Sequence, residues 1–186
     1  MHLAVGHTAK EPVPARQMDA MASALENDFG VRPFVLSALD SRVTVLVLRE
    51  PESRVIGVAQ DGERGMALVL VGSLNRPLPE WDDGSAMDSA DDVAAYLLAR
   101  FARHGDGFLD GVYGSYAVLV VDHRNGRAVI AADPTGLRTV FFTAADGESW
   151  FGTNLRGLVD CMDPKPGRPR HSPPTPTAGC WASASD

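Results

Sequence analysis

A strand-rich block at residues 106–160 constrains the fold of this chain more than any other feature. Its centre, Tyr116 to Val121, is apolar at every position, so both alternating sets of side chains are apolar. A strand of this kind needs cover on both of its faces, as in a sheet that lies between two other layers. The block therefore predicts a layered α+β fold.

Turn residues divide the block into further strands. The pair Asn125-Gly126 follows the first strand and tolerates the positive φ angles of a tight hairpin. Asp133 to Gly136 marks the turn after a strand at residues 128–132, and Ala145 to Gly147 the turn after a strand at residues 139–143. We expect a meander of four strands that is closed by a short helix at residues 154–160.

The first half of the chain predicts a helix followed by three strands. Residues 15–27 contain few helix breakers and are rich in alanine. Three β-branched runs follow, at residues 43–48, 55–59 and 66–71, with turn-forming stretches between them. Residues 74–87 are rich in Pro, Gly and Asp and should form a surface loop.

A second helix is predicted from its cap and its apolar face. Ser89 precedes two acids, Asp91 and Asp92, as expected at a helix N-terminus. Apolar residues then share one face at helical spacing: Val93, Ala94, Leu97, Leu98 and Phe101. This helix should end near His104-Gly105.

The composition favours one globular domain and argues against several classes of function. The chain has 186 residues, of which 45% are hydrophobic and 22% charged, enough for one ordinary core. Its formal charge of −7 argues against a surface that neutralises phosphates, so we expect no nucleic-acid partner. The apolar runs are too short to span a bilayer, and we expect a cytoplasmic protein with no membrane partner.

The sequence indicates neither a disulfide framework nor a metal site. The two cysteines, Cys161 and Cys180, lie at and beyond the end of the strand-rich block. The five histidines share no spacing with cysteines or acids that is typical of metal ligands. We therefore expect no metal and no cofactor.

Short motifs occur along the strand-rich block in a characteristic order. They are Phe108-Leu109, Gly114 to Asp122, Ala132-Asp133 with Gly136, Val140 to Phe142, and Phe151 to Leu158. Their order and spacing resemble the end of the glutamine amidotransferase type 2 domain that opens asparagine synthetase-like enzymes. The resemblance implies a four-layer αββα sandwich of the Ntn-hydrolase type, in which Asp133 and Gly136 are architectural turn residues.

The resemblance also implies a catalyst that this sequence does not supply. In N-terminal nucleophile hydrolases the first residue attacks the amide with its side chain and relays the proton through its own α-amine. Family members carry a cysteine directly after the initiator methionine, whereas this chain begins Met1-His2. We therefore expect no catalytic residue.

The substrate pocket implied by the resemblance is altered as well. Where family members have an Asn-Gly oxyanion pair and a glutamate that binds the substrate amine, this chain has Val71-Gly72-Ser73. The Gly72 N–H remains as an oxyanion donor. A second substrate-binding acid falls at Ala90 in strict register and at Asp91 after a slip of one residue. Gly72, Ser73 and Asp91 are thus our candidates for a vestigial substrate pocket.

Charged residues in and around these motifs also have interpretations that involve no substrate pocket. Asp91 and Asp92 can simply complement the dipole of the helix that they precede. Arg49 and Arg54 are interpreted as isolated, solvated residues with no part in a glutamine pocket.

The composition changes after Cys161. Residues 162–186 are rich in proline and have few aliphatic side chains, so they cannot bury enough surface to offset the entropy of ordering. We expect an amidotransferase-like domain at residues 1–161 and a disordered tail at residues 162–186. The tail is either translated out of frame after a disruption near residue 160 or a natural linker or terminus, where family members continue into an ATP-binding synthetase domain.

These observations lead to one hypothesis and two alternatives. The pattern resembles the amidotransferase-like domains of β-lactam synthetases and lasso-peptide cyclases, several of which have no N-terminal cysteine. The leading hypothesis is a catalytically silent domain, truncated or detached from an ATP-dependent amide-forming enzyme, with a scaffold or interaction role toward a synthetase domain or chain. The alternatives are a glutaminase subunit that works with a separate asparagine synthase-type chain, and a small-molecule sensor that uses the pocket around Gly72. A homo-oligomer is left open.

Overall fold

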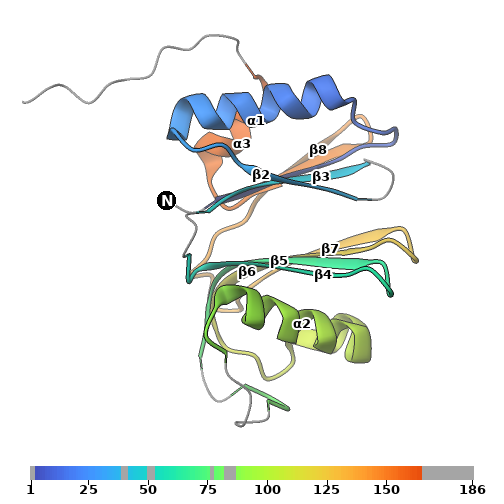
Figure 1. Ribbon diagram of the computed structural model, residues 1–186, viewed down its shortest axis with the longest axis vertical. Coiled ribbons are helices and arrows are strands. Elements are labelled where there is room, and N and C mark those ends of the chain that lie inside the picture. Colours follow the sequence, from blue (N-terminus) through green and yellow to red (C-terminus); the bar gives the residue numbers. More distant parts are fainter. Residues whose placement is uncertain (1–2, 39–41, 50–52, 76–77, 82–86, 165–186) are drawn as a thin grey trace, which may run out of the picture.

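The molecule is built from four layers of secondary structure (Figure 1). The computed structural model describes residues 3–38, 42–49, 53–75, 78–81 and 87–164. Helices α1 (Ala15–Phe29) and α3 (Leu155–Met162) cover a five-stranded sheet, and α2 (Ala90–His104) covers a four-stranded sheet on the opposite side of the molecule. The expected α+β class and the αββα sandwich are confirmed.

The five-stranded sheet has β1 at its centre. Its strands lie in the order β2 (Phe34–Ala38), β3 (Val43–Leu48), β1 (Leu3–Thr8), β9 (Glu148–Gly152) and β8 (Phe141–Ala145). All neighbouring pairs are antiparallel. The first strand of the chain thus pairs with one of its last strands, which closes the domain.

The four-stranded sheet follows the order of the chain. Its strands are β4 (Ile56–Asp61), β5 (Met66–Leu74), β6 (Gly114–Asp122) and β7 (Arg127–Ala132), all antiparallel. A short 3-10 helix, η1 (Gly105–Leu109), follows α2 and leads into β6. Gly126 has a φ of 63°, which the tight β6–β7 hairpin requires at its Asn-Gly turn.

The predicted four-strand meander is wrong in one respect. Its strands exist, but β6 and β7 belong to the four-stranded sheet whereas β8 and β9 belong to the five-stranded sheet. The chain crosses between sheets after the Asp133 to Gly136 turn. Two successive hairpins give the same alternation of strands and turns whether they share a sheet or not, so the sequence pattern alone did not separate these arrangements.

Three apolar clusters hold the layers together. One lies between α2 and the four-stranded sheet, one between the two sheets, and one between the five-stranded sheet and helices α1 and α3. Along β6, Val118 and Val120 belong to the first cluster, whereas Leu119 and Val121 belong to the second. The strand is therefore covered on both faces, as its apolar pattern predicted.

Both predicted long helices are confirmed, with Ser89 as the N-cap of α2. Ser89 Oγ accepts a hydrogen bond from the Asp92 N–H at 3.1 Å, and the Asp92 carboxylate accepts one from the Ser89 N–H at 2.9 Å. The Ser89 hydroxyl also donates to Asp92 Oδ2 at 2.8 Å, and this bond, followed by that from the Ser89 N–H, holds the pKa of Asp92 below its ordinary value. The predicted tail lies largely outside the described residues, as do parts of the 74–87 loop.

Candidate functional site

The predicted pocket residues Gly72 and Ser73 lie near the end of β5, beside the start of β6. Gly72 pairs with Tyr116, and Ser73 pairs with Ser115 and is exposed. The Gly72 N–H donates a hydrogen bond to the Val55 carbonyl oxygen at 2.6 Å. That donor is therefore already used within the fold and is not free to bind a developing negative charge.

Gly72 also has a steric role at this sheet end. Its φ is 128°, and a Cβ atom added there would lie 2.0 Å from the carbonyl oxygen of Ser115. Both facts restrict the position to glycine, because a side chain would force the two strands apart. The close approach of β5 and β6 is sufficient to explain this glycine.

Asp91, the third predicted pocket residue, connects α2 to two strands. Its Oδ1 accepts hydrogen bonds from Arg49 Nη1 at 2.6 Å and from the Val58 N–H at 2.8 Å. The interpretation of Arg49 as an isolated, solvated residue is therefore wrong, while Arg54 is exposed. Sequence distance hid the Arg49–Asp91 pair, since 42 residues separate its members. The assignment of Gly72, Ser73 and Asp91 to one substrate pocket stays a prediction.

The space between the two sheets is closed by apolar side chains. Phe151 of β9 lies over Gly6 of β1, where an added Cβ would come within 1.9 Å of the ring. One cavity among the described residues of this space has a volume of ≈ 20 Å³ and is lined by residues such as Val45, Val71 and Phe151. Ligand pockets usually enclose about 300 Å³ or more. This inner cavity is too small for an amino-acid substrate.

Comparison with known proteins connects this geometry to a family. Residues 79–160 match the family described as glutamine amidotransferase domain. Asparagine synthetase from Asparagus officinalis is 30% identical over 88 residues, which are 47% of this chain and 14% of that protein. The nodule asparagine synthetase of Pisum sativum is 30% identical over 70 residues, 37% of this chain and 11% of that protein.

The chain contains a glutamine amidotransferase domain of the asparagine synthetase type. A solved structure supports its fold: glutamine phosphoribosylpyrophosphate amidotransferase from B. subtilis aligns with a TM-score of 0.55 and 14% identity, over 86% of this chain and 43% of that one. The aligned segments span only 11–14% of the length of the asparagine synthetases. The activity of those whole proteins therefore does not pass directly to this amidotransferase domain.

The amidotransferase domain uses Asp133 to build the turn between its sheets. The buried carboxylate accepts hydrogen bonds from the Thr135 hydroxyl and from the backbone N–H groups of Thr135, Leu137 and Arg138. The bond from Thr135, followed by those from the backbone, lowers the pKa of Asp133 to about 2. All of these partners are local, which is consistent with the architectural role expected for Asp133.

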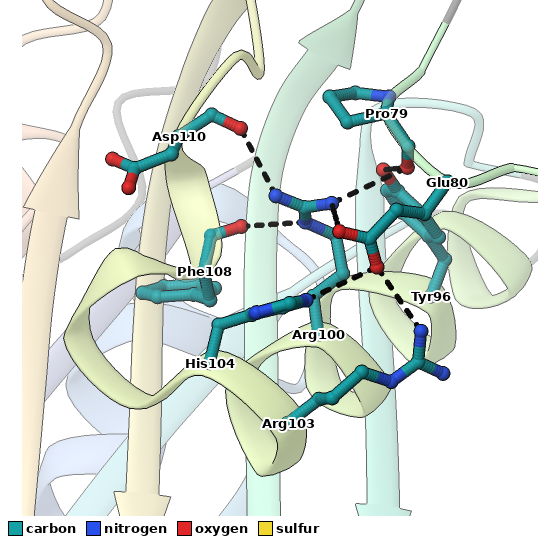
Figure 2. Close-up of polar contacts among 8 residues, drawn as sticks. All are labelled: Pro79, Glu80, Tyr96, Arg100, Arg103, His104, Phe108 and Asp110. Carbon is teal, nitrogen blue, oxygen red and sulfur yellow. Dashed lines mark hydrogen bonds and ion pairs between the residues drawn. The ribbon is translucent and has the colours of Figure 1, made fainter.

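A buried arginine, missed in the sequence, anchors two loops of the amidotransferase domain (Figure 2). Arg100 of α2 is 5% exposed and donates to the carbonyl oxygens of Phe108 at 2.8 Å, Asp110 at 3.0 Å and Pro79 at 3.3 Å. Glu80 contacts Arg100 at 3.3 Å and also binds Arg103 and His104, each at 3.0 Å. The His104 hydrogen bond is the main reason why the pKa of Glu80 is lowered.

A signal for Arg100 was present in the sequence. Arg100 follows Leu97 by three residues, so it lies next to the apolar face of α2 rather than on its exposed side. A charged residue at such a position needs buried partners. The partners are mostly backbone carbonyls, which no residue pattern identifies.

The described residues also contain a buried histidine in the amidotransferase domain. His7 of β1 is 1% exposed, stacks on Trp150 with ring centroids 4.0 Å apart, and places Nε2 at 3.2 Å from Glu148 Oε2. Its side chain lines a cavity of ≈ 350 Å³ together with Lys10 and Glu148, and Gly72 is not among the residues of that cavity. Among the described residues, no cluster of three or more His, Cys, Asp or Glu side chains suits a metal ion.

Within the part of the chain that the structure describes, no helix is long and apolar enough to cross a bilayer.

Proposed function

We propose that this amidotransferase domain is catalytically silent and acts as a scaffold or interaction module for an ATP-dependent, amide-forming synthetase of the asparagine synthetase type. The synthetase domain can lie on the same polypeptide or on a separate chain. The observation that carries the proposal is the hydrogen bond from the Gly72 N–H to the Val55 carbonyl oxygen, 2.6 Å long.

The use of this N–H argues against glutamine hydrolysis. Amide hydrolysis passes through a tetrahedral intermediate whose oxyanion needs preorganised donors. Gly72 is the residue that matches the glycine of the family's oxyanion pair, and Val71 before it has no side-chain amide. With the backbone donor paired to Val55, neither residue offers a free donor in this fold.

The state of Asp91 supports the same proposal. Asp91 Oδ1 accepts hydrogen bonds from Arg49 Nη1 and from the Val58 N–H. This arrangement ties α2 to β4 and to the end of β3, which is a structural use of the acid.

The intact core supports a scaffold role. All four layers of the sandwich are present and three apolar clusters fill the spaces between them. A domain that keeps its packing while its reactive groups are used internally is suited to hold a partner. The relatives are glutamine-hydrolysing asparagine synthetases, and a synthetase is therefore the partner that we propose.

A glutaminase assay tests whether the domain is catalytically silent. Purified protein incubated with glutamine should release no more glutamate than a heat-denatured sample, and the variant His2→Cys should also release none, because the oxyanion donor remains paired. Glutamate release that rises with protein concentration would reject the proposal and favour the alternative of a glutaminase subunit.

A separate experiment tests the scaffold role. The protein should co-purify with an asparagine synthase-type synthetase produced in the same cells, and the mixture should form amide product when ATP and an ammonium salt are supplied. A partner that is equally stable and active without this chain would contradict the scaffold role and leave the result of the glutaminase assay unaffected.

A further inference from the structure

Two turns lie side by side at the end of the four-stranded sheet that is opposite to Gly72. The His123 N–H donates to the Gly65 carbonyl oxygen at 2.8 Å, and Arg124 Nη2 donates to the carbonyl oxygen of Glu63. These bonds join the β6–β7 turn to the β4–β5 turn. Met66, at this end of β5, is six residues from Gly72, which corresponds to about 20 Å along a strand. The two ends are therefore separate sites.

A cavity of ≈ 350 Å³ opens beside these turns and the end of α2. Its buried walls include Met66, Phe101 and Asp122. Three arginines also line it: Arg64, Arg124 and Arg127. The volume is in the range of small-ligand pockets, and three guanidinium groups on one small cavity are a notable concentration in a chain with a net charge of −7.

Within the described residues, most donors of these arginines are not used by other groups. Arg64 Nη1 binds Asp61 at 2.8 Å, Arg124 uses Nη2 for the Glu63 carbonyl, and Arg127 uses Nη2 for Asp106. Each guanidinium has five N–H groups, and each donates one of the hydrogen bonds above to the described part of the chain, while that of Arg127 also lies over the Phe101 ring. Arginine binds oxyanions through pairs of parallel hydrogen bonds, so the remaining donors suit a compact oxyanion.

The neighbouring acids weaken the positive field without removing it. Asp106 is 73% exposed where it pairs with Arg127, and the side chain of Arg64 is 62% exposed beside Asp61. Exposed ion pairs of this kind contribute little free energy. A bound anion can therefore share these guanidinium groups with Asp61 and Asp106.

Asp122 adds an acceptor to the floor of the cavity. It lies opposite Arg127 in the sheet register and is 6% exposed. Burial opposes its ionisation, but the hydrogen bonds from Asn125 and the Arg124 N–H, together with the charge of Arg127, outweigh that effect and lower the pKa of Asp122. An ionised carboxylate only accepts hydrogen bonds. Each Asp122 oxygen already accepts one hydrogen bond from Asn125, at 3.1 and 2.6 Å, and each has a second lone pair for a ligand. A ligand with anionic oxygens and one O–H donor would therefore complement this cavity.

We propose that this cavity binds a hydrogen phosphate ion, with Arg64, Arg124 and Arg127 as donors to its anionic oxygens and Asp122 as the acceptor of its P–OH group. Sulfate has the same shape and no proton at neutral pH, so its oxygens would face the Asp122 carboxylate without a donor. The site should therefore distinguish phosphate from sulfate. This inference does not depend on the proposed scaffold function.

Titration of the whole protein with sodium phosphate, followed by amide chemical shifts at constant ionic strength, tests the proposal. Saturable shifts are expected at Gly65, Asn125 and Gly126, with at least tenfold tighter binding of phosphate than of sulfate. The variant Arg64→Gln should weaken phosphate binding roughly tenfold, as expected for the loss of one charge-assisted contact. The control Arg32→Gln, which removes an exposed arginine that pairs with Glu26 near α1, should bind phosphate unchanged.

Three results would overturn the proposal. They are the absence of saturable shifts at millimolar phosphate, shifts that centre on another part of the molecule, and equal binding by the wild type and Arg64→Gln when circular dichroism shows both to be folded. Equal affinity of the wild type for phosphate and sulfate would contradict the assignment of Asp122 as acceptor of the P–OH group. The variant Asp122→Asn is an independent check of that assignment, because it should bind the two ions equally whereas the wild type should prefer phosphate.

Discussion

At the scale of single residues, Gly72 gives the sharpest prediction. The variant Gly72→Ala should lose about 2–4 kcal/mol of unfolding free energy, because it combines a φ of 128° with a Cβ atom 2.0 Å from the Ser115 oxygen. Urea denaturation measures the loss. The matched control is Gly62→Ala, where an added Cβ has no atom within 4 Å and no positive φ has to be kept. It should change stability by less than about 1 kcal/mol.

The lowered pKa of Asp133 predicts how the free energy of unfolding depends on pH in the acid range. Its pKa is lowered from 3.8 to about 2 in the folded protein, mainly by the Thr135 hydrogen bond. A lowered pKa stabilises the fold above the unfolded value, and this contribution disappears as the pH falls from about 4 to about 2. The variant Asp133→Asn should be less stable than the wild type at pH 7, and urea denaturation across this range should show the difference shrinking.

A control separates this effect from general acid unfolding. Asp19 on α1 has a side chain that is 74% exposed and only approaches Arg32 at 3.8 Å. Asp19→Asn should follow the wild-type pH profile. A constant difference between Asp133→Asn and the wild type from pH 7 to pH 2 would contradict the role given to the Asp133 carboxylate.

At the scale of elements, the packing of α2 against its two neighbouring loops depends on the contacts of the buried Arg100. Arg100→Met should cost about 3 kcal/mol or more, because the carbonyl oxygens of Phe108 and Asp110 lose their donor and Glu80 loses a partner. The Pro79 carbonyl oxygen keeps the hydrogen bond from the Tyr96 hydroxyl. Arg103→Met is the matched control on the same helix: Arg103 also binds Glu80 but is 65% exposed, so its loss should cost less than about 1 kcal/mol. Urea denaturation measures the loss of unfolding free energy in both variants. Equal losses would contradict the anchoring role of Arg100.

The elements also show how far the sequence could predict this fold. The helices α1 and α2 and the strands β3 to β7 follow from patterns that are local in the chain, such as the Ser89 cap and the Asn125-Gly126 turn. Strands β1 and β2 carried no such signal: β1 contains Gly6 and His7, and becomes a strand because β3 and β9 pair with it on either side. Contacts between residues as distant as Arg49 and Asp91 leave no trace in one sequence. For the same reason, the use of the Gly72 N–H could not be foreseen.

At the scale of the whole molecule, the contact between the two sheets controls stability. Phe151 of β9 lies over Gly6 and belongs to the apolar cluster that joins the sheets, where it is 4% exposed. Phe151→Ala should cost about 3–5 kcal/mol through lost burial and the cavity that remains. Because the cluster contains residues of both sheets, amides of β3 and β5 should exchange hydrogen faster by similar factors.

The comparison with Phe142 makes this prediction specific. Phe142 lies on the neighbouring strand β8, pairs with Phe151 in the sheet register, and is 62% exposed. Phe142→Ala should therefore cost less than about 1 kcal/mol and leave the exchange of β5 amides unchanged. If Phe151→Ala accelerated exchange in the five-stranded sheet alone, the two sheets would be separate cooperative units, and the shared cluster would not be the basis of stability. Acceleration in both sheets would mean that a partner bound to either face of the sandwich stabilises the other face as well, which is the property that a scaffold domain requires.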